Sequence, residues 1–365
     1  MSERIKTKFI MICPASSQPR YHKRAAQLLS QSSLDVYAFE RGYYEQNKFA
    51  GIKLNSLGTL VSGSLFKRLV MIFKSIMTLR KVCKKDTLFY AFSIDTYILG
   101  RLAGFQSGIY EVGDIRTIDG NKKLLAFLEK WVVRDCKAVV LTSKYFYTNH
   151  YQKYTTEKGK FFVIENKLDN NFFCNLVSTK TTEVKNAKKK IRIGVIGFLR
   201  YEKPLKNLVK FVEKNNENYE IVCFGDGPLR EYVESLPDTI ISYHGSFKYP
   251  DDIEAIYTKV DVNYVVYDTV SENVKLALPN KLYESIFFEK PIIVAENTAL
   301  SYEVESRKVG KSVSVNDICM FEKSMSEIDG SWISEMSLNC SKTSKASMLD
   351  DGQEVIKKIL EDKLS

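Results

Sequence analysis

Short apolar runs alternate with longer amphipathic segments along the first half of the chain. The short runs predict strands at 8–13, 35–39, 87–91, 108–112, 138–141 and 161–164. The amphipathic segments predict helices near 20–29, 65–82, 96–103, 122–133 and 144–154. Such alternation is typical of parallel strands joined by helices.

A second series of the same kind begins near residue 191. Its strands are predicted at 192–196, 219–224, 240–243, 262–267 and 291–295, and its helices near 205–213, 229–234, 252–259 and 280–288. The polar stretch 177–190 between the series has no apolar period and predicts a linker.

The predicted fold is therefore α/β, with two Rossmann-like doubly wound domains facing across a cleft. The boundaries are 1–176, a linker at 177–190, and 191–345, followed by a C-terminal helix within 346–365 that packs on one domain or the other. In such folds ligands bind at the carboxyl ends of the strands.

The net charge of +10 is divided unevenly between the halves of the chain. Residues 1–180 carry 29 Lys and Arg against 14 Asp and Glu, a net of +15, and the remainder carries 25 against 30, a net of −5. The basic half suggests an anionic partner: nucleic acid, a membrane surface or a phosphorylated substrate. No recognisable nucleic-acid-binding signature is present, so we expect no nucleic-acid partner.

Several function classes are disfavoured by the composition. The longest apolar candidate, 65–79, is interrupted by Lys67, Arg68 and Lys74, too early for a membrane-spanning helix. The apolar run 9–13 ends at Pro14 and predicts a first strand, not a signal peptide, so we expect a cytoplasmic protein. Seven cysteines without a C-x-x-C pair, three histidines and no D-x-D triplet predict neither a disulfide framework nor a bound metal or cofactor.

The loops after the second-series strands carry candidate phosphate-binding residues. Gly197 ends a strand and is followed by Arg200 and Lys203 at the start of a helix, where free N–H groups and cations bind phosphate. Gly225 and Gly227 follow the next strand and allow close approach of the backbone to a ligand. A solvated loop and a tight turn are the respective alternatives.

A third candidate segment runs from Pro279 to Glu284. Asn280 is predicted to cap a helix, which would place Glu284 near the first turn of that helix. A carboxylate at this position can accept hydrogen bonds from both hydroxyls of a ribose. The alternative is that Glu284 merely interacts favourably with the helix dipole.

The order of these segments resembles the C-terminal domain of nucleotide-sugar-dependent glycosyltransferases of the GT-B fold, over about residues 160–315. The matching segments are VIENKLD (163–169), the loop ending in Lys203, FGDGP (224–228), YHG (243–245), YTKVDV (257–262), PNKLYE (279–284) and KPII (290–293). The resemblance implies that Lys203 binds the donor diphosphate, Glu284 the ribose, and the backbone of 245–248 the base. The donor-site candidates are therefore Gly197, Arg200, Lys203, Gly225, Gly227, Gly245, Phe247, Asn280, Lys281 and Glu284, with a UDP-sugar as the expected donor.

Two positions depart from the family pattern. Phe198 stands where the family has arginine, and Leu276 stands where retaining members have a second glutamate. Retaining and inverting mechanisms therefore both stay open. An inverting enzyme needs a general base from the N-terminal domain.

The first domain offers two candidates for that base. Asp114 follows the strand at 108–112, and Arg116 nearby would favour its ionised form; the alternative is an aspartate that caps the loop or pairs with Arg116. His22, in the segment after the first strand, is the second candidate, although loop histidines are commonly just exposed.

The basic segment 65–85 has one further interpretation. Leu65, Leu69, Ile72 and Ile76 form one helical stripe, with lysines at 67, 74, 81 and 85 on another. This helix either packs on the sheet or lies on anionic lipid. The family resemblance implies an acceptor such as a lipid-linked saccharide at the inner membrane face.

These observations predict a metal-independent glycosyltransferase of the hexosyl type. It would act in bacterial surface polysaccharide assembly, such as capsule or O-antigen, with peripheral membrane contact. A nucleotide-sugar 2-epimerase of the same fold and a non-catalytic nucleotide-sugar-binding subunit are the alternatives.

Overall fold

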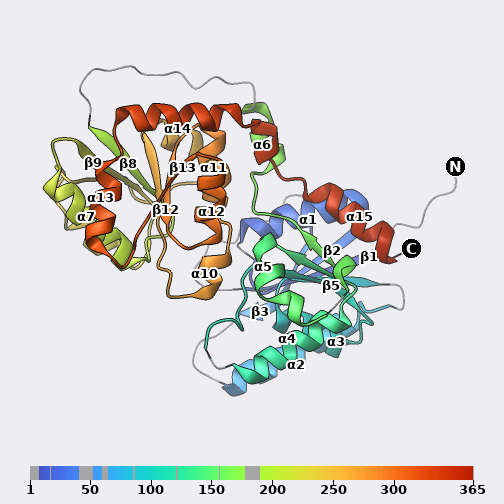
Figure 1. Ribbon diagram of the computed structural model, residues 1–365. Coiled ribbons are helices and arrows are strands. Elements are labelled where there is room, and N and C mark those ends of the chain that lie inside the picture. The colour runs from blue at the N-terminus through green and yellow to red at the C-terminus, as the bar shows by residue number, and fades with distance from the viewer. Residues whose placement is uncertain are drawn as a thin grey trace. The chain divides into compact units, whose positions relative to one another are not determined.

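The computed structural model describes residues 8–16, 18–40, 52–59, 65–84, 87–120, 122–155, 157–176 and 190–364 (Figure 1). The chain forms two compact units, Met1–Asn166 with Asp351–Ser365, and Lys167–Asp350. The boundary therefore lies at residue 166, whereas the sequence suggested 176. All of the predicted linker except Lys190 lies outside the described residues.

Packing explains where the two ambiguous segments belong. Helix α15 (Gly352–Leu364) joins the first unit, because Ile356 and Ile359 are fully buried in its core. Residues after Asn166 join the second unit, where the ring of Phe173 packs 5.5 Å from that of Phe287.

The first unit contains a seven-stranded parallel sheet. Its strands are β1 (Lys8–Cys13), β2 (Ser33–Glu40), β3 (Leu54–Thr59), β4 (Leu88–Ala91), β5 (Gly108–Val112), β6 (Ala138–Leu141) and β7 (Phe161–Val163). The order is β3-β2-β1-β4-β5-β6-β7, and every pairing is parallel. From β1 the chain adds β2 and β3 on one side of the sheet, and it then adds β4 to β7 on the other side. The position between β1 and β4 is therefore a topological switch point.

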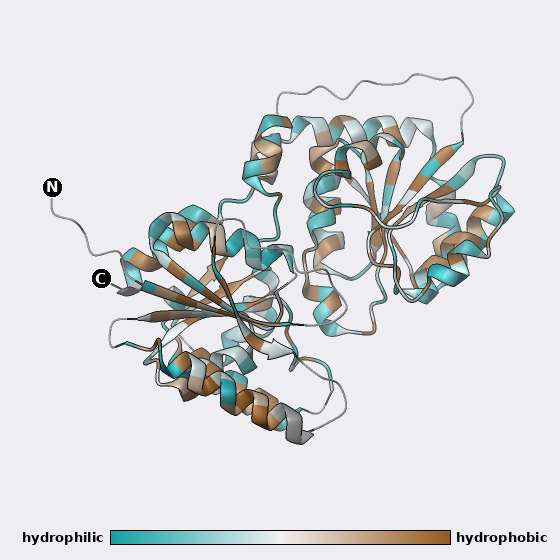
Figure 2. Ribbon diagram, turned by 180° about the vertical axis from the view of Figure 1, so that it is seen from behind, coloured by the Kyte–Doolittle hydropathy of each residue, from teal (hydrophilic) through white to brown (hydrophobic). Residues whose placement is uncertain are grey.

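The central strands are buried because helices cover both faces of the sheet. β5 and β6 are buried at every residue, and both read as continuous hydrophobic runs apart from Glu111 (Figure 2). The helices are α1 (Pro19–Gln31), α2 (Leu65–Arg80), α3 (Ile94–Ala103), α4 (Lys123–Asp135), α5 (Lys144–Asn149) and α15.

The second unit contains a six-stranded parallel sheet. Its strands are β8 (Ile191–Ile196), β9 (Tyr219–Phe224), β10 (Ile241–Tyr243), β11 (Val262–Val265), β12 (Ile292–Ala295) and β13 (Gly310–Val313). The order β10-β9-β8-β11-β12-β13 places its switch point between β8 and β11.

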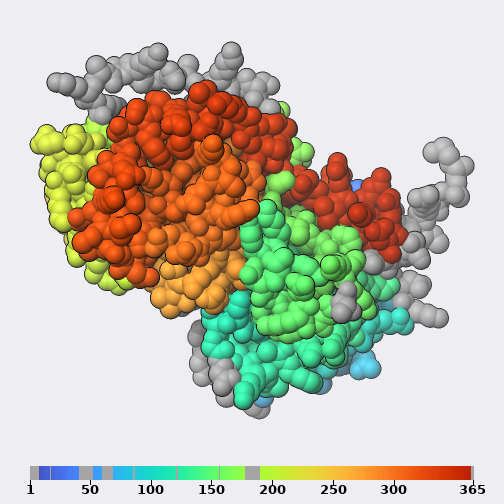
Figure 3. All heavy atoms as spheres, viewed as in Figure 1, coloured from blue at the N-terminus to red at the C-terminus, as the bar shows by residue number. Residues whose placement is uncertain are grey.

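Nine helices of the second unit are described. They are α6 (Asn170–Phe173), α7 (Glu202–Lys214), α8 (Arg230–Glu234), α9 (Ile253–Thr258), α10 (Glu272–Leu276), α11 (Asn280–Phe287), α12 (Ala299–Ser306), α13 (Ile318–Ser326) and α14 (Gly330–Lys342). In Figure 3, the orange and red surface of this unit includes α12, α13 and α14.

The predicted fold class, two doubly wound α/β domains, is confirmed. The predicted set of elements lacked strands β3 and β13 and helices α6, α10, α12, α13 and α14. Both missed strands lie at sheet edges, and their sequences, LNSLGT and GKSV, mix polar residues and glycine because an edge strand is only partly buried. Among the described residues, no helix has the length and hydrophobicity to span a bilayer.

Candidate functional site

Three glycine-containing loops of the second unit meet at the carboxyl ends of its strands. Gly197 follows β8, Gly225 follows β9 and Gly245 follows β10. The amide of Gly197 donates to the carbonyl of Phe224 at 2.8 Å, and the amide of Gly225 donates to the carbonyl of Gly245 at 2.7 Å. These bonds fix the backbone of the three loops against one another.

Glycine is required at 225 because the loops touch. Gly225 has φ +143°, and a Cβ built on it would overlap the carbonyl oxygen of Gly197. Gly227 is crowded in the same way by the backbone of Leu199. The sequence predicted that these glycines allow a ligand to approach the backbone. In this structure they allow the loop at 197–199 to approach it.

Glu284 lies in α11 with its side chain fully buried. Its carboxylate accepts hydrogen bonds from Asn280 Nδ2 at 2.7 Å, Lys281 Nζ at 2.6 Å and Tyr257 Oη at 3.1 Å. Burial and the nearby Glu284 raise the pKa of the Tyr257 hydroxyl well above its usual value, so Tyr257 remains a donor.

The prediction that Asn280 caps this helix is wrong by one residue. Pro279 is the N-cap, in extended conformation, and Asn280 is the first helical residue. Its amide reaches the next turn and binds Glu284, which lies in the second turn of α11.

Lys281 connects α11 to the first loop. Its Cε lies 3.8 Å from the position that a Cβ of Gly197 would occupy, and its Nζ lies 5.9 Å from the ring centroid of Phe247. Its side chain is 9% exposed and forms an ion pair with Glu284. The structure thus brings Gly197, Phe247, Lys281 and Glu284 together.

The other two predicted cations have different partners. Arg200 lies 4.7 Å above the ring of Tyr201 and donates to its hydroxyl at 2.6 Å, and Tyr201 stacks on Tyr267 with ring centroids 4.8 Å apart. Lys203, in the first turn of α7, donates to Asn316 Oδ1 at 2.6 Å. Both cations are exposed or half-exposed, so neither is fixed by burial.

A small cavity of about 50 Å³ lies at the switch point of this sheet. Its walls include Gly197, Arg200 and Tyr267. Ligands of doubly wound folds bind at such points, and two of the predicted donor-site residues, Gly197 and Arg200, line this cavity.

In the first unit, Asp114 lies beyond the carboxyl end of β5 and is exposed. It lines a cavity of about 70 Å³ together with Arg20, Ser93, Gly113 and Arg116. Arg116 forms an ion pair with Asp95 at 3.5 Å.

His22, the second candidate base, lies in the second turn of α1 and not in a loop, because the helix already begins at Pro19. Its Nε2 donates to the carbonyl of Ser16 at 2.9 Å. Burial lowers the pKa of His22, although the hydrogen bond to Ser16 acts in the opposite direction.

Sequence reasoning missed a buried charge network beside this cavity. Glu111 of β5 is fully buried, accepts hydrogen bonds from Arg24 Nε at 2.8 Å and Tyr90 Oη at 2.5 Å, and lies 3.5 Å from Arg20 Nε. Burial alone would raise the pKa of Glu111, but the charges of Arg24 and Arg20 hold it below its ordinary value. A glutamate inside an otherwise apolar strand was the available signal, since a buried charge requires partners.

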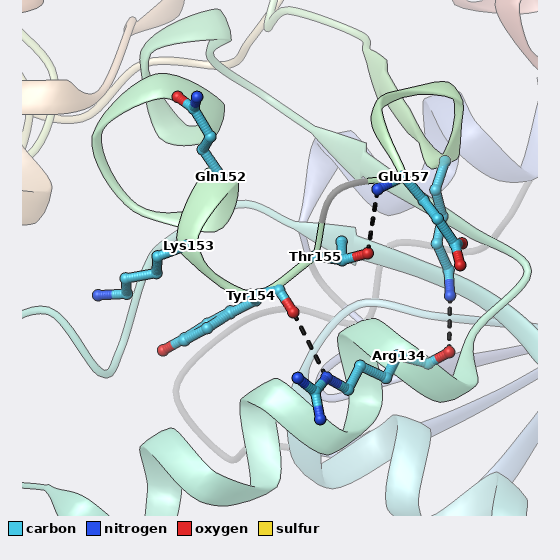
Figure 4. A pocket seen from close by; sticks show the side chains of 7 residues that line it. Arg134, Gln152, Lys153, Tyr154, Thr155 and Glu157 are labelled. Atoms are coloured by element: carbon cyan, nitrogen blue, oxygen red, sulfur yellow. Dashed lines mark hydrogen bonds between the residues drawn. The ribbon is translucent and has the colours of Figure 1, made fainter.

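A larger cavity of about 440 Å³ in the first unit contains none of the predicted residues (Figure 4). Arg134 Nε donates to the carbonyl of Tyr154 at 3.4 Å, and Lys160 Nζ donates to that of Arg134 at 2.7 Å. These two lining cations therefore bind backbone groups.

The basic helix α2 both packs on the sheet and exposes apolar residues. Ser75 and Leu79 are buried, whereas Leu69 and Phe73 are about two-thirds exposed, at 65% and 64%. The predicted stripe through Leu69 and Ile72 is therefore not the buried one. Helix α2 packs against α3, and α3 against α4, and Figure 2 colours much of these helices as hydrophobic. They expose further large apolar side chains: Val70, Ile72, Met77, Leu102, Leu124, Phe127 and Trp131.

Among the described residues, no group of three or more His, Cys, Asp or Glu side chains is placed to hold a metal ion. No protein-family model matches the chain, and no curated protein is similar to it in sequence.

Solved structures are similar in fold over nearly the whole chain. HepE from Anabaena in complex with UDP and glucose has 14% identity and a TM-score of 0.66, and sucrose-phosphate synthase from Thermosynechococcus elongatus has 13% and 0.69. The lipopolysaccharide outer core galactosyltransferase WaaB has 12% and 0.65. Each comparison covers 98% of this chain and 99% of the other. The chain therefore has the fold of the GT-B glycosyltransferases.

Proposed function

We propose that this protein is a glycosyltransferase that moves a sugar from a nucleotide-diphosphate sugar to a saccharide hydroxyl. The observation that carries the proposal is that Phe247, Lys281 and Glu284 lie together beside Gly197, which follows β8. The HepE structure is described in complex with UDP and glucose, which supports a UDP-sugar as the donor.

In the proposed donor complex, the carboxylate of Glu284 accepts hydrogen bonds from the ribose hydroxyls. One of its oxygens is bound by Asn280 and the other by Lys281 and Tyr257, so its orientation is fixed before the ligand arrives. The backbone of 245–248 contacts the base. Movement of Lys281 from Glu284 toward a diphosphate would exchange one anionic partner for another.

The leaving diphosphate needs positive charge, because its negative charge develops as the bond to the sugar breaks. Lys281 supplies a cation beside Gly197, where Phe198 replaces the arginine of related enzymes. Arg200 and Lys203 supply two more once they leave Tyr201 and Asn316.

For an inverting transfer, the acceptor oxygen attacks the anomeric carbon while the bond from that carbon to the diphosphate breaks. The proton of the acceptor hydroxyl passes to a base, which we assign to Asp114 because it lies exposed beyond the carboxyl end of β5. The nucleoside diphosphate leaves with the bonding electron pair.

We further assign the acceptor to lipid-linked saccharides of bacterial surface polysaccharide assembly. The apolar residues exposed on α2, α3 and α4 are accompanied by exposed lysines, including Lys74, Lys81 and Lys130. Apolar side chains with interspersed cations are suited to the surface of an anionic bilayer.

The experiment measures nucleoside diphosphate release from a panel of nucleotide sugars, with and without a lipid-linked saccharide extract. Release that depends on the extract is expected from a transferase. Conversion of donor without acceptor would instead identify an epimerase, and binding without turnover an accessory subunit.

The Asp114→Asn variant tests the assigned base in the same assay. It should retain donor binding and lose about 100-fold or more of the transfer rate, because general-base catalysis contributes roughly 10²–10⁴. Glu157→Gln, an exposed change in the same unit, is the control. Undiminished turnover in Asp114→Asn would remove this residue from the mechanism.

A further inference from the structure

We infer that the cavity bordered by Arg20, Ser93, Gly113 and Arg116 binds an oxyanion, a phosphate or a carboxylate. Its assignment to an anionic group of the acceptor rests on the proposed function, whereas the oxyanion site itself does not. The cavity lies at the carboxyl ends of β4 and β5, beside the switch point of the first sheet.

Arg20 is built into the wall of this cavity. Its Nε lies 3.5 Å from Glu111 and is buried without a hydrogen-bond partner, and its guanidinium lies 5.6 Å from the ring centroid of Tyr21. Glu111 is held in turn by Arg24 and Tyr90. The side chain of Arg20 is 18% exposed, so its position is set by packing.

Gly113 makes room for this guanidinium. A Cβ on Gly113 would overlap both Nη atoms of Arg20, and the residue also lines the cavity. Any side chain at 113 would therefore displace the arginine. Gly113 therefore allows the guanidinium of Arg20 to lie at the cavity wall.

Arg116 supplies a second cation at the rim. Its side chain is 49% exposed, and its Nη1 is 3.5 Å from Asp95, a long and solvent-screened pair. The planar donors of arginine match phosphate and carboxylate geometry. An oxyanion between Arg20 and Arg116 would gain charge-assisted hydrogen bonds from both.

The remaining walls fit the same ligand. Helices α1 and α3, of 13 and 10 residues, begin beside the cavity, and their N-terminal ends favour negative charge. Asp114 also lines the cavity, while Glu111 and Asp95 each lie 3.5 Å from one of the two arginines. The volume of about 70 Å³ is about twice that of one water in the liquid (~30 Å³), enough for a single phosphate or carboxylate group.

The inference is tested by NMR on the full chain labelled with ¹⁵N-arginine. The donor site is first saturated with UDP, and the protein is then titrated with inorganic phosphate and, separately, with glucuronate. We expect the side-chain signals of Arg20 and Arg116 to shift with a common dissociation constant. Stronger binding of phosphate points to a phosphorylated or diphosphate-linked acceptor, and stronger binding of glucuronate to an acidic sugar.

Variants separate a built site from general surface charge. Arg116→Gln and Gly113→Ala should each weaken oxyanion binding at least tenfold, the second without any change of charge. Arg80→Gln, an exposed arginine of α2, and Gly330→Ala, a glycine with open space around it, are the matched controls and should leave binding unchanged.

Wild-type affinity in both Arg116→Gln and Gly113→Ala would overturn the inference. Transfer activity without any oxyanion-induced shift of Arg20 and Arg116 would also overturn it and leave the proposed function intact. Shifts of both arginines in a protein without transfer activity would support the oxyanion site and contradict the proposed function.

Discussion

Two fully buried glutamates, Glu111 and Glu284, illustrate how single residues determine the candidate sites. Each carboxylate accepts hydrogen bonds from at least one cation and from a tyrosine hydroxyl: Arg24 and Tyr90 for Glu111, and Lys281 and Tyr257 for Glu284. Burial of a charge is costly unless it is paired and hydrogen-bonded. These partners therefore hold both carboxylates in fixed orientations.

Glu111→Gln should destabilise the first unit by about 3 kcal/mol at pH 7, because breaking a buried pair leaves Arg24 uncompensated. The folded-state pKa of Glu111 lies below its ordinary value, so the wild-type advantage is full above about pH 4.3 and decreases as the pH falls through the folded value. Urea unfolding in a Trp332→Phe background, with Trp131 as the reporter, measures the difference in unfolding free energy between wild type and Glu111→Gln. It is carried out at pH 7 and again at a pH below about 4.3.

Glu157→Gln, an exposed change in the same unit, is the control and should shift stability by less than about 0.5 kcal/mol. Equal stability of wild type and Glu111→Gln at pH 7 would show that the network contributes nothing.

At this scale the sequence order indicated which loops and helices meet, but it did not predict the contacts of their side chains. Glu284 and Lys281 lie together with Gly197 as the motif order suggested, since a strand end and a helix start define that position. The partners of Arg200 and Lys203 could not be predicted, because Tyr201 stacks on Tyr267 and Asn316 follows β13, a strand that the pattern did not reveal.

Among the elements, the loop after β9 is the most constrained. Gly225→Ala would place a methyl group against the carbonyl of Gly197 at a φ of +143°. We expect a loss of at least about 2 kcal/mol in the stability of the second unit, together with weaker UDP binding. Unfolding monitored by Trp332 in a Trp131→Phe background, with UDP calorimetry, measures both.

Gly330→Ala is the control for this loop, because nothing lies within 4 Å of a Cβ at that position. Wild-type stability and UDP affinity in Gly225→Ala would contradict the tight packing of the two loops.

The exposed apolar residues of α2 and α4 lead to a prediction about lipid. Phe73→Ser and Phe127→Ser, at positions 64% and 67% exposed, should each weaken binding to vesicles of mixed neutral and anionic phospholipid by roughly tenfold, since burying a Phe side chain gives about 1.5–3 kcal/mol. Sedimentation with vesicles measures the partition, which added salt should also weaken.

Leu338→Ser in α14, a residue 56% exposed in the second unit, is the matched control and should bind vesicles as the wild type does. The membrane assignment fails if both phenylalanine variants bind like the wild type.

Four strands that the pattern predicted correctly are buried at nearly every residue. β1, β5, β6 and β9 appear within a residue of their predicted bounds because their sequences are mainly apolar. The edge strands β3 and β13 and the surface helices after β12 have mixed polarity, so periodicity alone did not identify them.

For the whole molecule, the uneven charge is explained by two proposed sites in the basic half, the oxyanion cavity and the membrane-binding surface. The first 180 residues, with a net charge of +15, contain both the arginines of the oxyanion cavity and the lysines beside the exposed apolar residues. The remaining residues have a net charge of −5 and depend on a few placed cations. The fold class and the candidate donor-site region followed from sequence order, whereas the cavity beside Arg20 and Arg116 could be found only in the structure.

The central claim, that Glu284 holds the ribose of a nucleotide donor, is tested most directly by calorimetry with two ligands and two proteins. UDP and 2′,3′-dideoxy-UDP are titrated into wild type and Glu284→Gln, with Glu254→Gln, an exposed change in α9, as control. The account predicts that Glu284→Gln weakens UDP binding by about tenfold or more, as expected for hydrogen bonds to a charged group, and has little effect on the dideoxy ligand. Equal loss for both ligands, or no binding of UDP to the wild type, would contradict it.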